Sequence, residues 1–260
     1  MTTAGIDVGI QTAKAVIINS SGILSYAVIP GGSDPIPVVA EKVLNQAAKN
    51  AGISVGELSY IVSTGSSNEI VPMANSQSPD SISLARATNW LMPSVKIVLD
   101  IGAQKSISVK CQNGKAVKVA RNGRCAAGSG LYLEMVAKIF GVSLEGMTDL
   151  STQAKENLEV QSICAVFAES EIISLVHAKK NPPDIIKGVY SGLSKRLYPL
   201  LDQVSLEKDV AIVGGVARNR GMIIALQEMV GYDLLVPENP DIMVALGAAL
   251  IAEDKAGAEN

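Results

Sequence analysis

Two short stretches, Asp7-Val8-Gly9-Ile10-Gln11 and Asp100-Ile101-Gly102-Ala103-Gln104, share the pattern Asp-aliphatic-Gly-x-Gln. Each ends a run of apolar residues typical of a strand, and each is followed by a second such run. The next turns also match, because Ser21-Gly22 follows the first copy and Gln112-Asn113-Gly114 follows the second. One such loop is weak evidence. Two with matching flanks predict a duplicated lobe.

The chemistry of this repeated pattern suits a nucleotide. A tight turn closed by glycine lets backbone N–H groups approach phosphate oxygens, and an aspartate at a strand end can hold Mg²⁺ or its waters. We therefore interpret Asp7 and Asp100 as the metal and phosphate pair of an ATP/ADP site with Mg²⁺, and expect the two loops to face each other across a cleft. Gln104 can orient an attacking water by hydrogen bonding. The other expected cofactor contacts are Gly9, Gln11, Thr12, Lys14, Gly102, Ala103 and Lys105.

A third loop, Gly214-Gly215-Val216-Ala217-Arg218-Asn219, follows the apolar strand predicted over residues 209–213. Two glycines that open a helix allow a base or ribose to approach the backbone, and the helix N-terminus favours negative charge. We assign Gly214, Gly215 and Asn219 to the nucleoside. The alternative is that all three loops are ordinary turns between strand and helix, with aspartates acting as caps. The order of the three loops favours the nucleotide interpretation.

Composition narrows the class of protein. The 260 residues are 48% hydrophobic and only 3% aromatic, which favours an α/β fold with parallel strands under closely packed helices. A net charge of −3 gives no basic surface for nucleic acid or an anionic membrane. The apolar runs are too short to span a bilayer, and residues 1–7 lack a signal-peptide pattern, so we expect a cytoplasmic protein.

Hydrophobic periodicity and turn residues place the expected elements. Two lobes are expected, the first over residues 1–93 and completed by a C-terminal helix at about 244–260, and the second over residues 94–243. A segment rich in Ser, Asn and Gly, residues 63–79, is expected to be a functional loop. The expected strands are 4–9, 15–19, 23–29, 59–65, 95–99, 107–111, 115–120 and 209–213, and the expected helices are 35–50, 82–91, 131–140, 167–178 and 244–252.

The three loops in this order resemble the acetate kinase, sugar kinase, Hsp70 and actin fold, over the whole chain. The resemblance implies duplicated ribonuclease-H-like lobes of the actin/hexokinase/Hsp70 ATPase type, with a nucleotide cleft between them. Arg124-Cys125-Ala126-Ala127-Gly128-Ser129-Gly130 and Ser162-Ile163-Cys164-Ala165-Val166-Phe167-Ala168-Glu169-Ser170-Glu171 are similar to the two cysteine motifs of one family on that fold. This family contains 2-hydroxyacyl-CoA dehydratase activators and benzoyl-CoA reductase ATPase subunits. The resemblance implies that Cys125 and Cys164 bind a [4Fe-4S] cluster shared by two subunits.

The positions of these cysteines agree with that implication. Cys125 and Cys164 each precede a predicted helix, and a helix N-terminus favours a thiolate. Two thiolates cannot complete a four-cysteine cluster, so a second subunit must supply the rest, in a homodimer or a pseudo-symmetric heterodimer. The alternative is that both cysteines are small buried apolar residues. We interpret Cys111 and the single histidine, His177, as structural.

The resemblance implies an ATP-hydrolysing electron-transfer component that reduces a partner iron-sulfur reductase or dehydratase acting on a CoA thioester, with ferredoxin or flavodoxin as donor. The stretches Ala4-Gly5-Ile6-Asp7, 151–154 and 162–166 favour a benzoyl-CoA reductase subunit, whereas 213–219 favours a dehydratase activator. At the second loop, activators typically read Asp-Ile-Gly-Gly-Gln-Asp, and here Ala103 and Lys105 replace the second Gly and the second Asp. A small-molecule kinase on the same fold and a non-catalytic nucleotide sensor are the alternatives from other classes.

Overall fold

The structure is a computed structural model that describes residues 1–65, 71–123, 130–160 and 165–258. The chain divides into two compact units, each made of segments that are distant in sequence. Unit 1 comprises Met1–Val95, Val109–Val117 and Asp241–Asn260, and unit 2 comprises Lys96–Ser108 and Lys118–Pro240. One copy of the Asp-x-Gly-x-Gln pattern lies in each unit.

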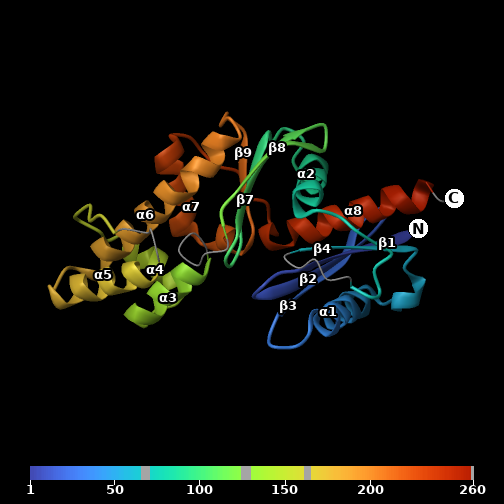
Figure 1. The fold of residues 1–260 in the computed structure, drawn as a ribbon, viewed down its shortest axis with the longest axis horizontal. Helices are drawn as coiled ribbons and strands as arrows, with labels where there is room; N and C mark the ends of the chain where they lie inside the picture. Colours follow the sequence, from blue (N-terminus) through green and yellow to red (C-terminus); the bar gives the residue numbers. More distant parts are fainter. Residues whose placement is uncertain (66–70, 124–129, 161–164, 259–260) are drawn as a thin grey trace. The chain divides into compact units, whose positions relative to one another are not determined.

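Unit 1 contains a five-stranded sheet in the order β3-β2-β1-β4-β5. Figure 1 labels the strands β1 to β4 of this sheet. The first three strands form an antiparallel meander, whereas β1 pairs with β4 in parallel and β4 with β5 in parallel. The parallel pairing of β1 with β4 requires a crossover, which contains α1, Ile36–Ala51. The strands are β1 Thr2–Val8, β2 Thr12–Asn19, β3 Gly22–Pro30, β4 Tyr60–Gly65 and β5 Ser76–Gln77.

Helices cover both faces of the unit 1 sheet. α1 packs on one face, where its Val43 and Leu44 join a core with Ile6 and Ile17. On the other face, β1 and β4 pack against α8, Met243–Ala258, which also packs on α2, Asp80–Leu91 (Figure 1). Small residues make this second contact possible, since a side-chain carbon added at Gly5 would lie 2.8 Å from the backbone carbon of Ala248. A short 3-10 turn, Val55–Glu57, precedes β4.

Unit 2 contains most of a four-stranded sheet in the order β8-β7-β6-β9. β6 runs parallel to β9. A parallel pair requires a crossover connection, which the long chain segment between these two strands provides. β7 and β8 are joined by a two-residue turn at Asn113 and Gly114, both with positive φ, which is the geometry of a type I′ hairpin. The strands are β6 Ile97–Ile101, β7 Ser106–Gln112, β8 Lys115–Arg121 and β9 Val210–Val213.

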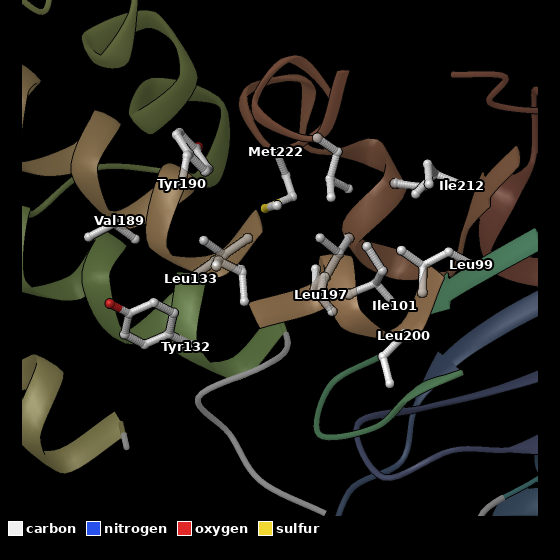
Figure 2. Close-up of a cluster of buried hydrophobic side chains, with 14 of the residues drawn as sticks. Leu99, Ile101, Tyr132, Leu133, Val189, Tyr190, Leu197, Leu200, Ile212 and Met222 are labelled. Atoms are coloured by element: carbon white, nitrogen blue, oxygen red, sulfur yellow. The ribbon is translucent and has the colours of Figure 1, made fainter. Parts of the chain in front are cut away.

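Among the described residues, five helices build the rest of unit 2 around an aliphatic core. Figure 2 shows Leu99, Ile101 and Ile212 of the sheet facing Leu133, Leu197 and Met222 of the helices. Sequence analysis predicts only two of these helices outright and assigns no element to α4 or to α6, the longest described helix. The helices are α3 Gly130–Phe140, α4 Leu144–Ser151, α5 Ala165–His177, α6 Pro182–Gln203 and α7 Arg220–Val230, with short 3-10 turns at Gly215–Arg218 and Pro240–Ile242.

The predicted strands of the duplicated pattern and the helices at 35–50, 82–91, 131–140, 167–178 and 244–252 are confirmed, with boundaries shifted by a few residues. The C-terminal helix runs to Ala258, beyond the helical pattern recognised at 244–252 and close to the end of the segment 244–260 expected to complete the first lobe. Among the helices of the described residues, none is long and apolar enough to cross a membrane.

Candidate functional site

Loop A, residues 9–12, carries the first copy of the Asp-x-Gly-x-Gln pattern. It is a tight turn in which the N–H of Gly9 donates to the carbonyl of Thr12 at 3.0 Å. Asp7 lies in register with Lys14 on the neighbouring strand, and Lys14 Nζ is 3.4 Å from Asp7 Oδ2. Asp7 is only 8% exposed, so its carboxylate is a largely buried anion with a cation beside it. Gln11 is half-buried within the turn.

Loop B, residues 102–105, repeats this geometry in unit 2. The N–H of Gly102 donates to the carbonyl of Lys105 at 2.9 Å, which is the same bond across the same number of residues. Ala103, Gln104 and Lys105 are half-buried. The second copy of the pattern is therefore a structural repeat of the first.

Loop B has an additional connection, to the beginning of α3. The N–H of Gly130 donates to the carbonyl of Gly102 at 2.9 Å, and the N–H of Leu131 donates to that of Ala103 at 3.1 Å. The first N–H groups of a helix have no partner within the helix, so these bonds satisfy two of them. The start of α3 is thereby fixed to the predicted phosphate loop.

A glycine on the parallel neighbouring strand covers each aspartate. Gly65 follows Thr64 of β4, which pairs with Asp7, and Gly214 follows Val213 of β9, which pairs with Asp100. Both glycines have positive φ, +121° and +85°. A side-chain carbon at Gly65 would lie 2.9 Å from Asp7 Oδ1, and one at Gly214 would overlap Asp100 Oδ1. The local sequence does not predict this pairing, although a β-branched residue followed by glycine, Thr64-Gly65 and Val213-Gly214, stands at the end of both strands.

The third loop differs in part from the prediction. The two glycines do not open a helix directly, because the 3-10 turn Gly215–Arg218 comes first and α7 begins at Arg220. The N–H of Gly214 donates to the carbonyl of Pro240, whereas a side chain at Gly215 would meet open space. Asn219 is buried: its Oδ1 accepts from the N–H of Met222 and its Nδ2 donates to the carbonyl of Leu144, so it caps α7.

Of the three cysteines, only Cys111 lies in the described part of the chain. Its Sγ is 3.7 Å from the carbonyl of Val109 on β7, and burial raises the pKa of the thiol to about 12. Cys111 is therefore a neutral thiol, as expected of a structural cysteine. His177 is the exposed last residue of α5.

Cys125 and Cys164 lie outside the described residues, but the helices that follow them do not. α3 begins at Gly130, five residues after Cys125, and α5 begins at Ala165, the residue after Cys164. The two helices share one core, in which Leu133 and Tyr132 of α3 join Ile172 of α5. Within the described ranges, no group of three or more His, Cys, Asp or Glu side chains could hold a metal ion.

The loops and the cysteine segments lie within residues 4–252, which match the model of a known family described as the BadF/BadG/BcrA/BcrD ATPase family. The chain belongs to this family. It is thus an ATPase-family protein, and the predicted resemblance is confirmed. Its relatives in the BadF/BadG/BcrA/BcrD ATPase family include the activator of lactoyl-CoA dehydratase from Anaerotignum propionicum, 34% identical over 98% of this chain and 99% of the relative. A benzoyl-CoA reductase subunit from Thauera aromatica is 30% identical over 95% and 92% of the two chains.

Solved structures agree with the family assignment. The Acidaminococcus fermentans (R)-2-hydroxyglutaryl-CoA dehydratase component A has a TM-score of 0.93 at 30% identity, covering 99% of both chains. The activator of the 2-hydroxyisocaproyl-CoA dehydratase from Clostridium difficile, with bound ADPNP, has a TM-score of 0.89 at 30% identity and covers 100% of this chain and 97% of that chain. A ROK family glucokinase from Streptomyces griseus, 11% identical over 98% of this chain and all of the kinase chain, shares the fold at a TM-score of 0.59. The predicted α/β fold class of hexokinase-like ATPases is confirmed.

The comparisons correct one preference of the sequence analysis. The stretches at 4–7, 151–154 and 162–166 favour a benzoyl-CoA reductase subunit, but the activators match at identities of up to 34% and supply both solved family structures described above. Short local likenesses are outweighed by similarity over the whole chain. The activator interpretation, given above as the alternative, has the better support.

Proposed function

We propose that this ATPase is the activator of a 2-hydroxyacyl-CoA dehydratase, to which it delivers electrons at the expense of ATP. The observation that carries the proposal is the full-length similarity to dehydratase activators, at 34% identity to one and a TM-score of 0.93 to another. Fold alone does not decide function, since a glucokinase shares the architecture. The presence of cysteines at both family motifs supports the electron-transfer role.

For the nucleotide, we assign Asp7 and Asp100 to Mg²⁺ and the phosphates. Each carboxylate stands at a strand end beside a glycine-closed turn, where backbone N–H groups can reach phosphate oxygens. We assign Gln104 to the attacking water. The remaining proposed contacts are Gly9, Gln11, Thr12, Lys14, Gly102, Ala103 and Lys105 for the phosphates and Gly214, Gly215 and Asn219 for the nucleoside. Because the side chain of Asn219 is already held by two protein partners, its contribution is to fix the loop.

The chain has cysteines that suit two of the four ligand positions of an iron-sulfur cluster. Cys125 and Cys164 precede two helices that pack in one core, and a helix N-terminus favours the thiolate that binds iron. Burial raises the pKa of the Cys111 thiol to about 12, which disfavours the thiolate form that binds iron. Two thiolates per chain imply that a second subunit completes a [4Fe-4S] cluster. When bound, such a cluster supplies one-electron transfer.

The bonds between loop B and α3 give the nucleotide a route to the cysteine segment. Gly102 and Ala103 accept hydrogen bonds from the first two N–H groups of α3, whose preceding segment carries Cys125. A shift of loop B on ATP hydrolysis therefore moves the start of α3. A ligand can shift a conformational equilibrium only if it binds the two states differently, so the ATP and ADP states are expected to differ here.

The partners follow from this role. We propose a dimer of this chain, or a pseudo-symmetric pair with a homologous subunit, that takes electrons from ferredoxin or flavodoxin in the cytoplasm. The electron acceptor is the iron-sulfur dehydratase component.

The proposal is tested by iron and nucleotide measurements on anaerobically purified protein. We expect a brown protein with about four irons per dimer, loss of iron in Cys125→Ala and Cys164→Ala, and unchanged ADPNP binding in both variants. Cys111→Ala is the matched control and should keep its iron. A protein that stays colourless after reconstitution with iron and sulfide would contradict the electron-transfer role, and a kinase would be indifferent to all three substitutions.

A second assay separates the activator from the reductase subunit favoured by the sequence stretches. The reduced protein with ATP should support dehydration of a 2-hydroxyacyl-CoA by an activator-free dehydratase component. Support of aromatic-ring reduction by a benzoyl-CoA reductase lacking its ATPase subunits, without dehydratase activation, would assign the chain to the other branch.

A further inference from the structure

Three side chains form a row across the unit 1 sheet at the predicted nucleotide loop. Lys14 of β2 pairs with Asp7 of β1, and Asp7 pairs with Thr64 of β4. Residues paired in register point to the same face of a sheet, so all three lie on one side. This is the face that α8 covers further along the strands, where Val62 packs on Ala248. We call these three residues the Asp7 row.

Thr64 is the member of the row whose polar group makes no hydrogen bond in the described structure. Its Oγ1 is buried and, within the described residues, has no hydrogen-bond partner. A buried hydroxyl without a partner is unfavourable, and such a group in a folded protein calls for an explanation. By contrast, Asp7 and Lys14 form an ion pair with each other.

The duplicated unit shows that the fold does not need this hydroxyl. In unit 2, Asp100 pairs with Val213 as Asp7 pairs with Thr64, and a positive-φ glycine follows in both cases. Valine has nearly the shape of threonine but has a methyl group in place of the hydroxyl. Because Val213 fills the position without a polar group, the hydroxyl of Thr64 is not a packing requirement of this architecture.

The chemistry of the row indicates which group accepts a hydrogen bond from the Thr64 hydroxyl. Gly65, the residue after Thr64, has no side chain, and a side-chain carbon added there would lie 2.9 Å from Asp7 Oδ1. A hydroxyl beside a metal-binding carboxylate can donate to an oxyanion, and the carboxylate cannot. We propose that Thr64 is a further nucleotide contact, whose hydroxyl donates a hydrogen bond to a phosphate oxygen of the Mg²⁺-bound nucleotide at Asp7. This inference rests on the proposed function of the Asp7 loop.

The adjacent residue offers a matched control. Ser63 also has a buried hydroxyl without a partner in the described structure. It pairs with Ile6, which belongs to the core under α1, so it lies on the opposite face from Asp7. Any effect of removing a buried hydroxyl from β4 in general will appear in both variants, whereas an effect through the nucleotide will appear only at Thr64.

The test compares Thr64→Val, Thr64→Ser and Ser63→Ala with the unmodified chain, using ADPNP with Mg²⁺ and adenosine as probes in calorimetric titrations. Hydrogen bonds to charged groups set the expected scale, so Thr64→Val should weaken ADPNP binding about tenfold or more and leave adenosine binding unchanged. Thr64→Ser should restore the affinity, and Ser63→Ala should not change it. Without nucleotide, Thr64→Val should melt at the same or a higher temperature, because an unsatisfied hydroxyl is removed.

Equal ADPNP affinity in Thr64→Val and the unmodified chain would overturn the role of Thr64 and leave the proposed function intact. The same loss in Ser63→Ala would also overturn it, since the effect would then be structural. Failure of the unmodified chain to bind ADPNP would instead overturn the proposed function itself.

Discussion

Position 214 requires glycine for two reasons at the scale of a single residue. Its φ of +85° is strained for any residue with a side chain, and a side-chain carbon would overlap Asp100 Oδ1 and lie 2.6 Å from the carbonyl oxygen of Ile101. Gly215, its neighbour, has neither constraint, because its φ is not positive and open space surrounds it. The pair therefore separates crowding at the carboxylate from a general effect of adding a methyl group to this loop.

We expect Gly214→Ala to lower the free energy of unfolding by about 2–5 kcal/mol and to reduce ATP turnover, since it must displace Asp100 or the strand. Gly215→Ala should change the free energy of unfolding by less than about 0.5 kcal/mol. Denaturant titrations and ATPase assays measure both effects. Similar free energies of unfolding for the two variants would show that the backbone at Asp100 can move aside at little energetic cost.

Asp184 gives the stability of unit 2 a dependence on pH. Its buried carboxylate accepts hydrogen bonds from the N–H groups of Glu156 and Lys155. The bond from Glu156, together with that from Lys155, lowers the pKa of Asp184 below its ordinary value of 3.8. A group whose pKa is lower in the folded state contributes stability above its unfolded pKa, and this contribution is lost as the pH falls through the folded pKa.

We therefore expect Asp184→Asn to flatten the acid side of the stability curve. The variant keeps an acceptor for the two N–H groups but does not titrate. Its free energy of unfolding, measured in urea at a series of pH values from neutral to below 3.8, should fall less steeply than that of the unmodified chain. Parallel curves over that range would assign the acid sensitivity to other carboxylates.

At the residue scale, the sequence predicts those residues of the candidate site that belong to a local sequence pattern. Asp7 and Asp100 lie near the ends of equivalent strands, and Gly9 and Gly102 begin equivalent turns, because the pattern itself specifies a tight turn after a strand. The roles of Gly65 and Thr64 could not be predicted in this way, since they depend on which strand lies beside β1. That strand begins more than fifty residues later in the chain, and no local pattern carries its register.

At the scale of elements, α8 depends on an almost continuous set of small residues. A side-chain carbon at Gly247 would overlap the carbonyl group of Ser83 on α2 and lie 2.8 Å from its Cα. Gly257, on the same helix, has nothing within 4 Å. Both are glycines in a helix, but only Gly247 lies at a contact with another element.

Opposite effects are expected from the two alanine substitutions in α8. Gly247→Ala should lower the free energy of unfolding by about 1–3 kcal/mol because it overpacks the contact with α2. Gly257→Ala should raise it, by up to about 1 kcal/mol, because alanine favours a helix. Thermal melts of the two variants measure the difference. A stabilising Gly247→Ala would mean that α2 moves away at little cost.

Elements with strong periodicity or turn signals are the ones that the sequence predicts. The meander of β1 to β3 follows from alternation and from the turn at 19–22, and α1 follows from its helical spacing. α6 is not predicted because Pro182, Pro183 and Pro199 interrupt its pattern. The first two prolines occupy the start of the helix, where a missing N–H costs nothing, and Pro199 lies in its last turns. Whether a proline ends a helix depends on its position within that helix. The sequence alone does not show this position.

At the scale of the whole molecule, each unit has its own hydrophobic core. Leu197 belongs to the core of unit 2 and Leu44 to that of unit 1, and both are buried almost completely. One copy of the Asp-x-Gly-x-Gln pattern lies in each unit, and this repeat is the sequence feature from which two lobes are predicted. The exact division could not be predicted, because the tip of the β7–β8 hairpin, Val109–Val117, belongs to unit 1 through spatial contacts alone.

Separate cores predict separate responses to mutation. Leu197→Ala and Leu44→Ala should each lower the free energy of unfolding by about 2–5 kcal/mol. In hydrogen-exchange mass spectrometry, Leu197→Ala should accelerate exchange first in α6 and α3, and Leu44→Ala first in α1 and β2. Exchange that accelerates equally in both units for either variant would show that they unfold as one.

The packing of α8 on β1 also affects how the protein is made. β1 is translated before α8: Ala245 and Ala248, which lie against Gly5, follow it by about 240 residues. At 5–20 residues per second this interval is on the order of 10–50 s. One face of the nascent unit 1 sheet therefore stays uncovered until α8 has been made, which leaves it open to a chaperone, while the segments of unit 2 are complete before α8 appears.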